Sequence, residues 1–210
     1  MAIGTDYIEI PRPLIQDKTG YLLVKRTLDV MASVALLVLL AIPMAAIALL
    51  VRLDSPGPAL FRQERLGKGG RPFTIYKYRS MRLDAESEGP QWADRDDSRC
   101  TRLGRMLRKT RLDELPQLWN ILIGDMSFVG PRPERAYFYR EFEKQIHGFR
   151  YRLLVVPGLT GLAQVNGGYD LKPEEKILYD MRYIESRSIG VDLLCVFKTI
   201  RLVFTHEGAR

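Results

Sequence analysis

VMASVALLVLLAIPMAAIALLV, residues 30–51, forms a nearly unbroken apolar run in which only Ser33 and Pro43 are not plainly apolar. As one straight helix, at about 1.5 Å per residue, the run would reach roughly 33 Å. That length is enough to cross the hydrocarbon core of a bilayer. A signal peptide fits poorly, because the run is too long, begins late and lacks a cleavage site of small residues. The sequence therefore predicts a membrane segment near the N-terminus.

The charges around this run argue against a simple crossing. Lys25 and Arg26 precede it and Arg52 follows it, whereas a crossing segment carries its positive charge mainly on the cytoplasmic side. Pro43 lies near the middle, where it removes a backbone hydrogen bond and kinks a helix. Both features favour a re-entrant helical hairpin that enters and leaves by the cytoplasmic face. A kinked single span is the alternative.

Further along the chain, two adjacent carboxylates occur within RLDELPQLWN, residues 111–120. The basic residues around them are Arg108, Lys109, Arg111 and Arg132. An ionised carboxylate can act as a covalent nucleophile on phosphorus. Neighbouring cations would neutralise the phosphate oxygens that otherwise repel it. Asp113 and Glu114 are therefore candidates for phosphoryl chemistry.

The carboxylate pair is expected in the first turns of a helix, because Thr110 followed by Asp113 approximates a capping box. Pro116 leaves the start of this helix open. Adjacent residues on a helix point about 100° apart, so Asp113 and Glu114 should take distinct roles and not share one proton. The helix N-terminus and the arginines should keep Asp113 ionised at neutral pH, as a nucleophile requires.

Length and composition allow one domain with a hydrophobic core beside the membrane segment. The chain has 210 residues, of which 46% are hydrophobic. We expect an N-terminal arm or surface strap at residues 1–20, the re-entrant membrane helix at 21–53 and a catalytic domain at 54–210. The net charge of +7 indicates an anionic partner, such as nucleic acid, an acidic lipid surface or a phosphorylated substrate. Two distant cysteines and two histidines suggest neither a disulfide framework nor a zinc site.

The remaining segments predict an α+β domain that is mostly helical. Residues 59–66 and 72–81 alternate around Gly67-Lys-Gly-Gly70, which is typical of a β-hairpin. Residues 101–109 form a basic amphipathic helix suited to an anionic membrane surface. The other expected segments are a helix at 134–147 ended by Gly148, a β-like stretch at 151–168, a helix at 173–186 and an apolar interfacial helix at 191–204.

Three sequence blocks carry a resemblance to a known family. They are LDELPQLWN at 112–120, GDMSFVGPRP at 124–133 and PGLTGLAQVNG at 157–167. In this order they resemble the bacterial sugar transferase family, the monotopic phosphoglycosyl transferases, and the resemblance runs from residue 25 to residue 204. It implies transfer of a hexose 1-phosphate from a UDP-sugar to polyprenyl (undecaprenyl) phosphate. The implied location is the cytoplasmic face of the bacterial inner membrane, and the implied pathway is glycoconjugate or exopolysaccharide synthesis.

The resemblance also implies roles for single residues. Asp113 would attack the sugar-linked phosphorus and release UMP, and the lipid phosphate would then attack the covalent intermediate. Glu114 would orient the site or, together with Asp113, hold Mg²⁺, which spreads the diphosphate charge. Arg132, fixed between two prolines, and Arg108 would clamp phosphate oxygens.

More distant positions are also predicted to take part in substrate binding. Lys77 and Arg79 alternate with tyrosines on the second strand of the hairpin, so both cations should point to one face, near the active site by resemblance. A solvated strand face is the alternative. Asp192 matches an acidic family position near the site, or it caps the last helix. Gly168 and Tyr169 lie where many members carry an arginine, so this loop is a candidate for sugar or nucleotide recognition. The departure leaves glucose, galactose and an N-acetylated sugar open.

Other functions compete with this one. A non-catalytic adaptor would use the membrane segment and the basic helix to bind anionic lipid, and Asp113→Asn would leave its function intact. The charge permits a nucleic-acid binder, but no recognised fold signature supports one, and we expect no nucleic-acid partner. A phosphatase with an aspartyl-phosphate intermediate would use water as the final acceptor. A metal site among Asp94, Asp96 and Asp97 lacks EF-hand spacing. The sequence leaves self-association into a homo-oligomer open.

Overall fold

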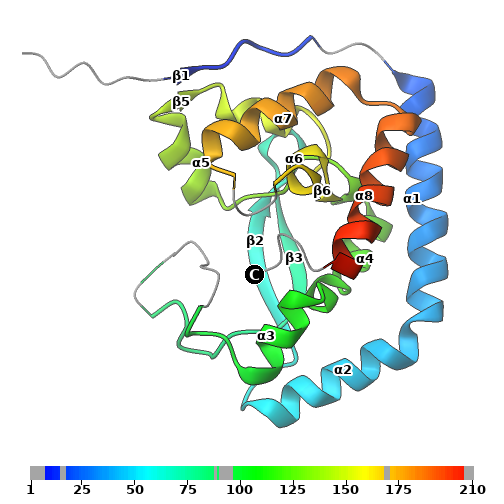
Figure 1. Ribbon diagram of the computed structural model, residues 1–210, viewed down its shortest axis with the longest axis vertical. Coiled ribbons are helices and arrows are strands. Elements are labelled where there is room, and N and C mark those ends of the chain that lie inside the picture. The colour runs from blue at the N-terminus through cyan, green and yellow to red at the C-terminus, as the bar shows by residue number, and fades with distance from the viewer. Residues whose placement is uncertain (1–7, 15–17, 88, 90–96, 168–170, 206–210) are drawn as a thin grey trace, which may run out of the picture.

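The computed structural model describes residues 8–14, 18–87, 89, 97–167 and 171–205. Helices dominate it, and its short strands pair two by two, so the α+β class is confirmed. Figure 1 shows a central β-hairpin with a long bent pair of helices along one side of the body and below it.

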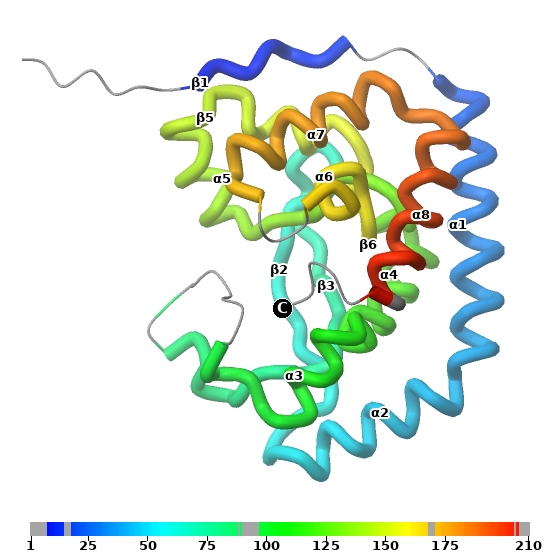
Figure 2. Tube along the Cα trace, in the orientation of Figure 1, coloured from blue at the N-terminus to red at the C-terminus, as the bar shows by residue number. Residues whose placement is uncertain are grey.

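This bent pair consists of α1, Thr19–Leu39, and α2, Ala41–Asp54. The two axes are bent by 65°, and Figure 2 shows the corner between them. The break falls at Leu40 and not at Pro43, where the sequence placed the kink. Pro43 is the third residue of α2. Backbone N–H groups in the first turn of a helix have no intrahelical acceptor, so proline costs no hydrogen bond there. No single described helix is long and apolar enough to cross a membrane, whereas this bent pair passes that test by length and composition.

The predicted β-hairpin is confirmed. Strand β2, Leu60–Leu66, pairs antiparallel with β3, Pro72–Tyr78. The 3₁₀ turn η1, Lys68–Gly70, joins them, and Gly69 and Gly70 have φ of 70° and 77°. Only glycine reaches such angles without a steric penalty at Cβ, so the glycine run is what allows the tight reversal.

A helical stretch follows the hairpin and carries the two carboxylates. Helix α3, Arg102–Lys109, matches its prediction, and the Thr101 side chain caps it by accepting a hydrogen bond from a backbone N–H at 2.9 Å. The chain then passes through the 3₁₀ turn η2, Leu112–Glu114, into α4, Gln117–Ile123. Strand β4, Ser127–Val129, follows directly.

The helix predicted at 134–147 is shorter than expected. Helix α5 covers Ala136–Glu143, and β5, Ile146–His147, follows it as a strand. Gly148, with φ of 94°, does not end α5 but precedes the 3₁₀ helix η3, Phe149–Leu154. The prediction extended the helix too far, because Ile146 continues the helical spacing of the apolar residues. In the structure Ile146 packs into the same core as α5 but lies in strand β5.

The stretch predicted as β-like, 151–168, contains only one described strand, β6, Gly158–Thr160, which runs parallel to β4. A short helix, α6, Leu162–Val165, comes next. The last two predicted helices are confirmed as α7, Pro173–Ser186, and α8, Ile189–Thr205. The first position of α7 suits proline, because the N–H that proline lacks would have no intrahelical acceptor there.

The described part of the N-terminal arm lies on the body of the protein as a strap. Strand β1, Ile8–Glu9, runs parallel to β5, and the next residue, Ile10, is buried in the main core. Farther along, Lys18 Nζ donates to Arg187 O at 2.9 Å. These contacts tie the arm to the surface on both sides of the gap in the described residues.

Three hydrophobic clusters meet along the hairpin. Leu66 belongs to the largest, between α5, η3, α7 and α8; Ile75 packs with α4 and α1; Tyr78 packs with α2 and α3. The hairpin is therefore fixed along its whole length by burial of apolar side chains. It provides a rigid wall on which a site can be built.

Candidate active site

The carboxylate pair lies in a tight turn and not in the first turn of an α-helix. Asp113 and Glu114 occupy η2, and α4 begins only after Pro116. Thr110 does not cap this turn, because its hydroxyl donates to a carbonyl of α3 at 2.9 Å. Arg111, with φ of 57°, is the one described residue other than glycine with positive φ. Such a backbone costs free energy and is concentrated at functional sites, where the surrounding structure holds it.

Asn120, at the end of the same motif, fastens α4 to the hairpin. Its Nδ2 donates to Thr74 O at 2.7 Å, and its Oδ1 accepts from Tyr76 N at 3.1 Å. The buried amide therefore satisfies backbone groups on the free edge of β3. This attachment sets Lys77, the next residue on the strand, against the carboxylates.

Glu114 is held by two cations. Its Oε1 lies 2.7 Å from Lys77 Nζ and 2.6 Å from the Arg132 guanidinium. Burial opposes ionisation, but Arg132 and Lys77 outweigh it and hold the pKa of Glu114 well below its usual range. A buried carboxylate with two such partners keeps its charge and its position. Glu114 is therefore fixed and ionised throughout the physiological pH range.

Asp113 has a different environment. Its side chain is buried and lines a cavity, and in the described part of the chain no group donates a hydrogen bond to its carboxylate. Burial raises the pKa of Asp113 to about 6, although Lys77 acts against the shift and Glu114 adds to it. The carboxylate is still mostly ionised at pH 7. A desolvated, unpaired carboxylate beside cations is suited to nucleophilic attack. The two carboxylates thus differ in environment, as their adjacent positions suggested.

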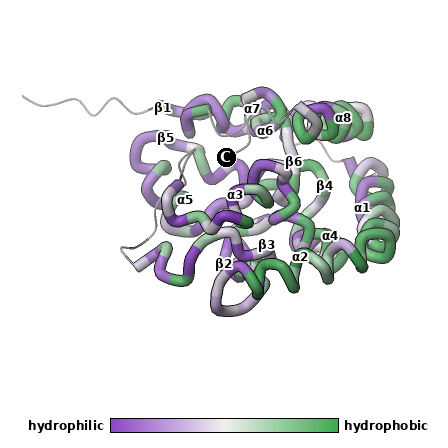
Figure 3. Tube along the Cα trace, turned by 60° about the horizontal axis from the view of Figure 1, so that its bottom comes forward, coloured by the Kyte–Doolittle hydropathy of each residue, from purple (hydrophilic) through white to green (hydrophobic). Residues whose placement is uncertain are grey.

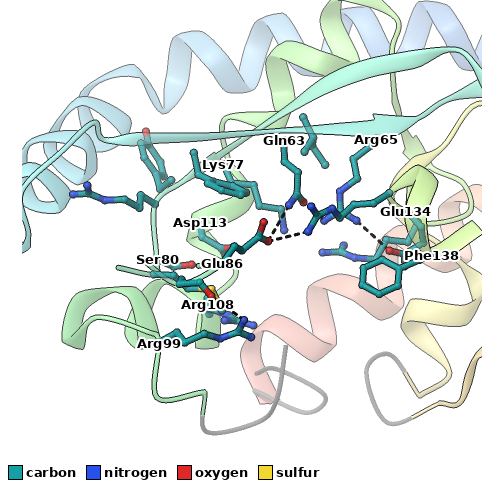
Figure 4. A pocket seen from close by; sticks show the side chains of 18 of the residues that line it. Gln63, Arg65, Lys77, Ser80, Glu86, Arg99, Arg108, Asp113, Glu134 and Phe138 are labelled. Carbon is teal, nitrogen blue, oxygen red and sulfur yellow. Dashed lines mark hydrogen bonds and ion pairs between the residues drawn. The ribbon is translucent and has the colours of Figure 1, made fainter. Parts of the chain in front are cut away.

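The cavity next to Asp113 has a volume of about 470 Å³. In Figure 4, Asp113 and Arg108 lie on one side of it, and Glu134 and Phe138 lie on the other. Arginine dominates its charged lining, which includes Arg65, Arg99, Arg108, Arg111, Arg132, Arg135 and Arg152. The size and positive charge of this cavity suit a polyanion such as a nucleoside diphosphate.

The structure brings several predicted site residues together. Lys77, Arg108 and Arg132 line the same cavity as Asp113, and two of them contact Glu114. Arg108 also donates to Cys100 Sγ at 3.0 Å, which fixes its guanidinium at the cavity wall. Their roles in substrate binding stay predictions.

Arg79 lines the cavity too, but its guanidinium is engaged elsewhere. It donates to Ser55 O at 2.7 Å, to Ser55 Oγ at 3.0 Å and to Pro56 O. Ser55 and Pro56 directly follow α2, so Arg79 holds the end of that helix. Its nearly complete burial excludes the solvated strand face considered above.

Asp192 lies outside the residues that line the cavity. Its carboxylate accepts hydrogen bonds from Tyr21 at 2.9 Å, Lys25 at 2.7 Å and Tyr183 at 2.9 Å. It therefore joins α8 to α1 and α7. The cap of α8 is Ser188, whose Oγ accepts from a backbone N–H at 3.3 Å, so Asp192 is not the helix cap either. Gly168 and Tyr169 lie outside the described residues, as do Asp94 and Asp96.

Some residues of the cavity were not predicted. Glu134 pairs with Arg65 at 3.1 Å across the end of the cavity that Figure 4 shows opposite Asp113. Its place directly after the Pro-Arg-Pro motif was a usable signal. Arg152 lines the cavity and pairs with Asp180, and no local pattern marks either residue, because only the tertiary fold brings them together.

The residues present fit a magnesium ion of the kind that the resemblance implies. Among the described residues no group of three or more metal-ligating side chains occurs. Magnesium, however, is commonly held by one or two carboxylates together with substrate phosphates. Asp113 supplies one carboxylate at the cavity wall, which meets the lower limit of that requirement, while Oε1 of the adjacent Glu114 is bound by Lys77 and Arg132.

Comparison with known proteins identifies the family of this chain. The model of the bacterial sugar transferase family matches residues 20–206. The chain belongs to this family.

Several relatives of this chain have names that describe similar reactions. An N-acetylgalactosaminephosphotransferase that uses undecaprenyl phosphate, from Aeromonas hydrophila, is 47% identical over 90% of this chain and 46% of its own length. A Bacillus subtilis protein named as a putative undecaprenyl-phosphate N-acetylgalactosaminyl 1-phosphate transferase is 50% identical over 66% of this chain and 78% of its own. A glucose-1-phosphate transferase from Caulobacter vibrioides is 43% identical over 88% of this chain and 71% of its own. The chain thus spans about half the length of some relatives that it matches and more of others.

Proposed function

We propose that this chain transfers a hexose 1-phosphate from a UDP-sugar to a polyprenyl phosphate. The observation that carries the proposal is a pair of adjacent carboxylates at the edge of an arginine-lined cavity. Asp113 is buried and accepts no hydrogen bond from any described group, and Glu114 is fixed by two cations. The names of the relatives support the class of acceptor and the transferred group.

The reaction takes place in two displacements at the same phosphorus. An oxygen of the Asp113 carboxylate attacks the sugar-linked phosphorus, a P–O bond forms, and the bond to the bridging oxygen breaks with release of UMP. An oxygen of the polyprenyl phosphate then attacks this phosphorus, and its bond to Asp113 breaks. The products are polyprenyl diphosphate hexose and the free carboxylate.

The charged residues of the cavity serve this chemistry by neutralising the phosphates. Arg132 and Lys77 are held by Glu114, the neighbour of Asp113, and Arg108 lines the same cavity. Cations placed in advance stabilise charge that develops in the transition state. Magnesium, when bound at Asp113 and Glu114 with the substrate phosphates, would draw charge from the diphosphate leaving group.

The membrane-embedded part of the proposal rests on exposed apolar side chains. On α1 and α2, Leu23, Val38, Leu39, Ile42 and Leu53 are each more than two-thirds exposed, and on α8 Phe197 is 70% exposed. Figure 3 shows hydrophobic residues gathered along α1, α2 and α8, with hydrophilic residues on α5 and β5. Such surface is stable in lipid and costly in water. We propose that α1 and α2 form a re-entrant hairpin at the cytoplasmic face of the bacterial inner membrane, which gives the site access to a lipid acceptor.

The direct test is release of UMP by the purified protein in nanodiscs with magnesium and undecaprenyl phosphate. A panel of UDP-glucose, UDP-galactose and their N-acetylated forms identifies the donor. We expect release with at least one sugar and its loss in Asp113→Asn, while Asp54→Asn, the same change at an exposed position, retains it. If the folded wild type releases no UMP from any sugar, or if Asp113→Asn remains active, the proposal is wrong and a lipid-binding adaptor becomes the better account.

A further inference from the structure

The loop that carries Arg132 is held from two directions. At its start, Gly130 N donates to Thr160 O and Gly158 N donates to Pro131 O, both at 2.9 Å, as an extension of the β4–β6 pair. The two strands approach so closely that a Cβ on Gly158 would lie 2.0 Å from Gly130 N. These bonds fix the strand end of the loop, but not the residue whose side chain enters the site.

A second contact holds that residue. The Arg152 guanidinium donates through one terminal nitrogen to Arg132 O at 2.9 Å and through Nε to Asp180 Oδ2 at 2.6 Å. Arg152 and Asp180 are both almost completely buried, and the guanidinium lies 4.9 Å from the centre of the Phe149 ring. Arg152 is therefore locked in one orientation by α7, by an aromatic ring and by the loop itself.

A contribution to folding stability is a weak explanation for the buried ion pair of Arg152 and Asp180. A buried ion pair gains little over well-packed apolar residues, because both charges lose their hydration. What only arginine supplies here is a planar fork that binds a carboxylate and a carbonyl at the same time. The carbonyl belongs to Arg132, whose own guanidinium reaches Glu114 Oε1 at 2.6 Å.

We propose that Arg152, oriented by Asp180, is a positioning residue for the transfer reaction. It fixes the backbone of Arg132 so that the Arg132 guanidinium stays on Glu114 and faces the phosphate bound beside Asp113. The inference rests on the proposed function for its effect on turnover, but not for its structural part. Because Arg152 also lines the cavity, direct contact with substrate is the competing role, and the two roles predict different kinetics.

The test uses Arg152→Lys, which keeps the charge and can still pair with Asp180 but cannot bind both partners as a planar fork. Arg150→Lys is the matched control, since Arg150 is an exposed residue of the same 3₁₀ helix. Asp180→Asn is the second variant; it leaves Arg152 in place and weakens its orientation. Two quantities are measured in nanodiscs: amide hydrogen exchange in a peptide covering residues 128–135, and kcat and KM for the UDP-sugar.

In both variants we expect amide exchange in residues 128–135 to become about tenfold faster. Loss of one charge-assisted hydrogen bond makes opening of the loop easier by about this factor. Exchange elsewhere should stay unchanged. We also expect kcat to fall by roughly 10–100-fold with KM nearly unchanged, because misplacement of a catalytic group lowers turnover. The Arg150→Lys control should match the wild type in both measurements.

Three results would overturn the inference. Unchanged exchange at 128–135 would show that Arg152 does not hold the loop, and faster exchange over the whole domain would show a general role in stability. A large rise in KM with kcat preserved would assign Arg152 to substrate binding. If the wild type shows no turnover, the proposed function fails, yet the exchange measurement still decides whether Arg152 positions the loop.

Discussion

At the scale of single residues, the site separates two neighbouring carboxylates by their surroundings. Glu114 has two cationic partners within 2.7 Å, and Asp113 has burial without a hydrogen bond from any described group. The burial of Asp113, the residue that we propose to attack phosphorus, therefore lowers the folding stability at neutral pH. Its neighbour carries the ion pairs that organise the site.

This cost predicts a stabilised but inactive variant. The pKa of Asp113 is about 6 in the folded protein against an ordinary 3.8, so the folded state binds the proton more tightly. The tighter binding of this proton by the folded state stabilises the fold fully below pH 3.8, and this stabilisation is lost as the pH rises through 6. Asp113→Asn should therefore unfold with a higher free energy at pH 7, by up to about 3 kcal/mol for a shift of about two units. The gain should vanish near pH 4, which urea unfolding at several pH values would show, with Asp54→Asn as the control.

The sequence sufficed to mark this motif as a candidate for phosphoryl chemistry, but not to predict its geometry. Two carboxylates among arginines indicate phosphoryl chemistry from residue types alone. The left-handed backbone of Arg111, and the position of an Asp113 carboxylate that accepts no hydrogen bond from the described residues, depend on how η2 packs against the β-hairpin. Asp192 shows the limit most clearly, because its partners come from α1 and α7, far away in the sequence.

At the scale of elements, α1 carries a polar face that packs against the rest of the protein. Four residues at intervals of four, Tyr21, Lys25, Asp29 and Ser33, place polar groups on one face of an apolar helix. Asp29 Oδ1 accepts from the backbone N–H of β4 residue Phe128 at 3.1 Å. This spacing is visible in the sequence and could have predicted a polar face on the helix. In the sequence we interpret Lys25 and Arg26 only as evidence on how the segment meets the membrane. Polar contacts of this kind fix α1 relative to the strand that leads to Arg132.

Arg26 provides a test of this attachment. Its two terminal nitrogens donate to Ile121 O at 2.6 Å and Leu122 O at 2.7 Å, so it caps the C-terminus of α4. Arg26→Lys keeps the charge but loses one of the two bonds, and should lower the free energy of unfolding by about 1–3 kcal/mol. Arg52→Lys, the same change at an exposed position on α2, should have no comparable effect. Equal effects in chemical denaturation would show that the cap contributes nothing.

Arg79 provides a second test at this scale. Its guanidinium binds carbonyls at the end of α2, so Arg79→Lys should loosen α2 and lower stability while leaving KM for the UDP-sugar within about twofold of the wild type. Steady-state kinetics together with thermal unfolding would show this pattern. A tenfold rise in KM without loss of stability would instead support the binding role predicted from the sequence.

At the scale of the whole molecule, the bent helix pair and the site are parts of one structure. The β2–β3 hairpin joins the helix pair to the site, because Tyr78 packs against α2 while the preceding residue, Lys77, contacts Glu114. The sequence predicted an apolar helical segment with a break, but not the place of the break or the packing of α1 on α4. Those depend on long-range contacts that no local pattern reveals.

The topology of the pair is tested by labelling. Gly20→Cys and Asp54→Cys place thiols at exposed positions near the two ends of the pair, and the native Cys100 and Cys195 are buried. A re-entrant hairpin predicts that a membrane-impermeant maleimide labels both variants in inverted vesicles and neither in right-side-out vesicles. Labelling of the two variants from opposite sides would establish a kinked single span.

The central claim, that Asp113 is a covalent nucleophile, is tested most directly by peptide mass spectrometry. The wild type is incubated with the UDP-sugar and magnesium but without polyprenyl phosphate, so that the second displacement cannot occur. We expect a mass increase of one hexose phosphate on the peptide that contains Asp113, and its loss when polyprenyl phosphate is added. Transfer of the sugar phosphate to lipid without any adduct, or an adduct on another residue, would contradict it.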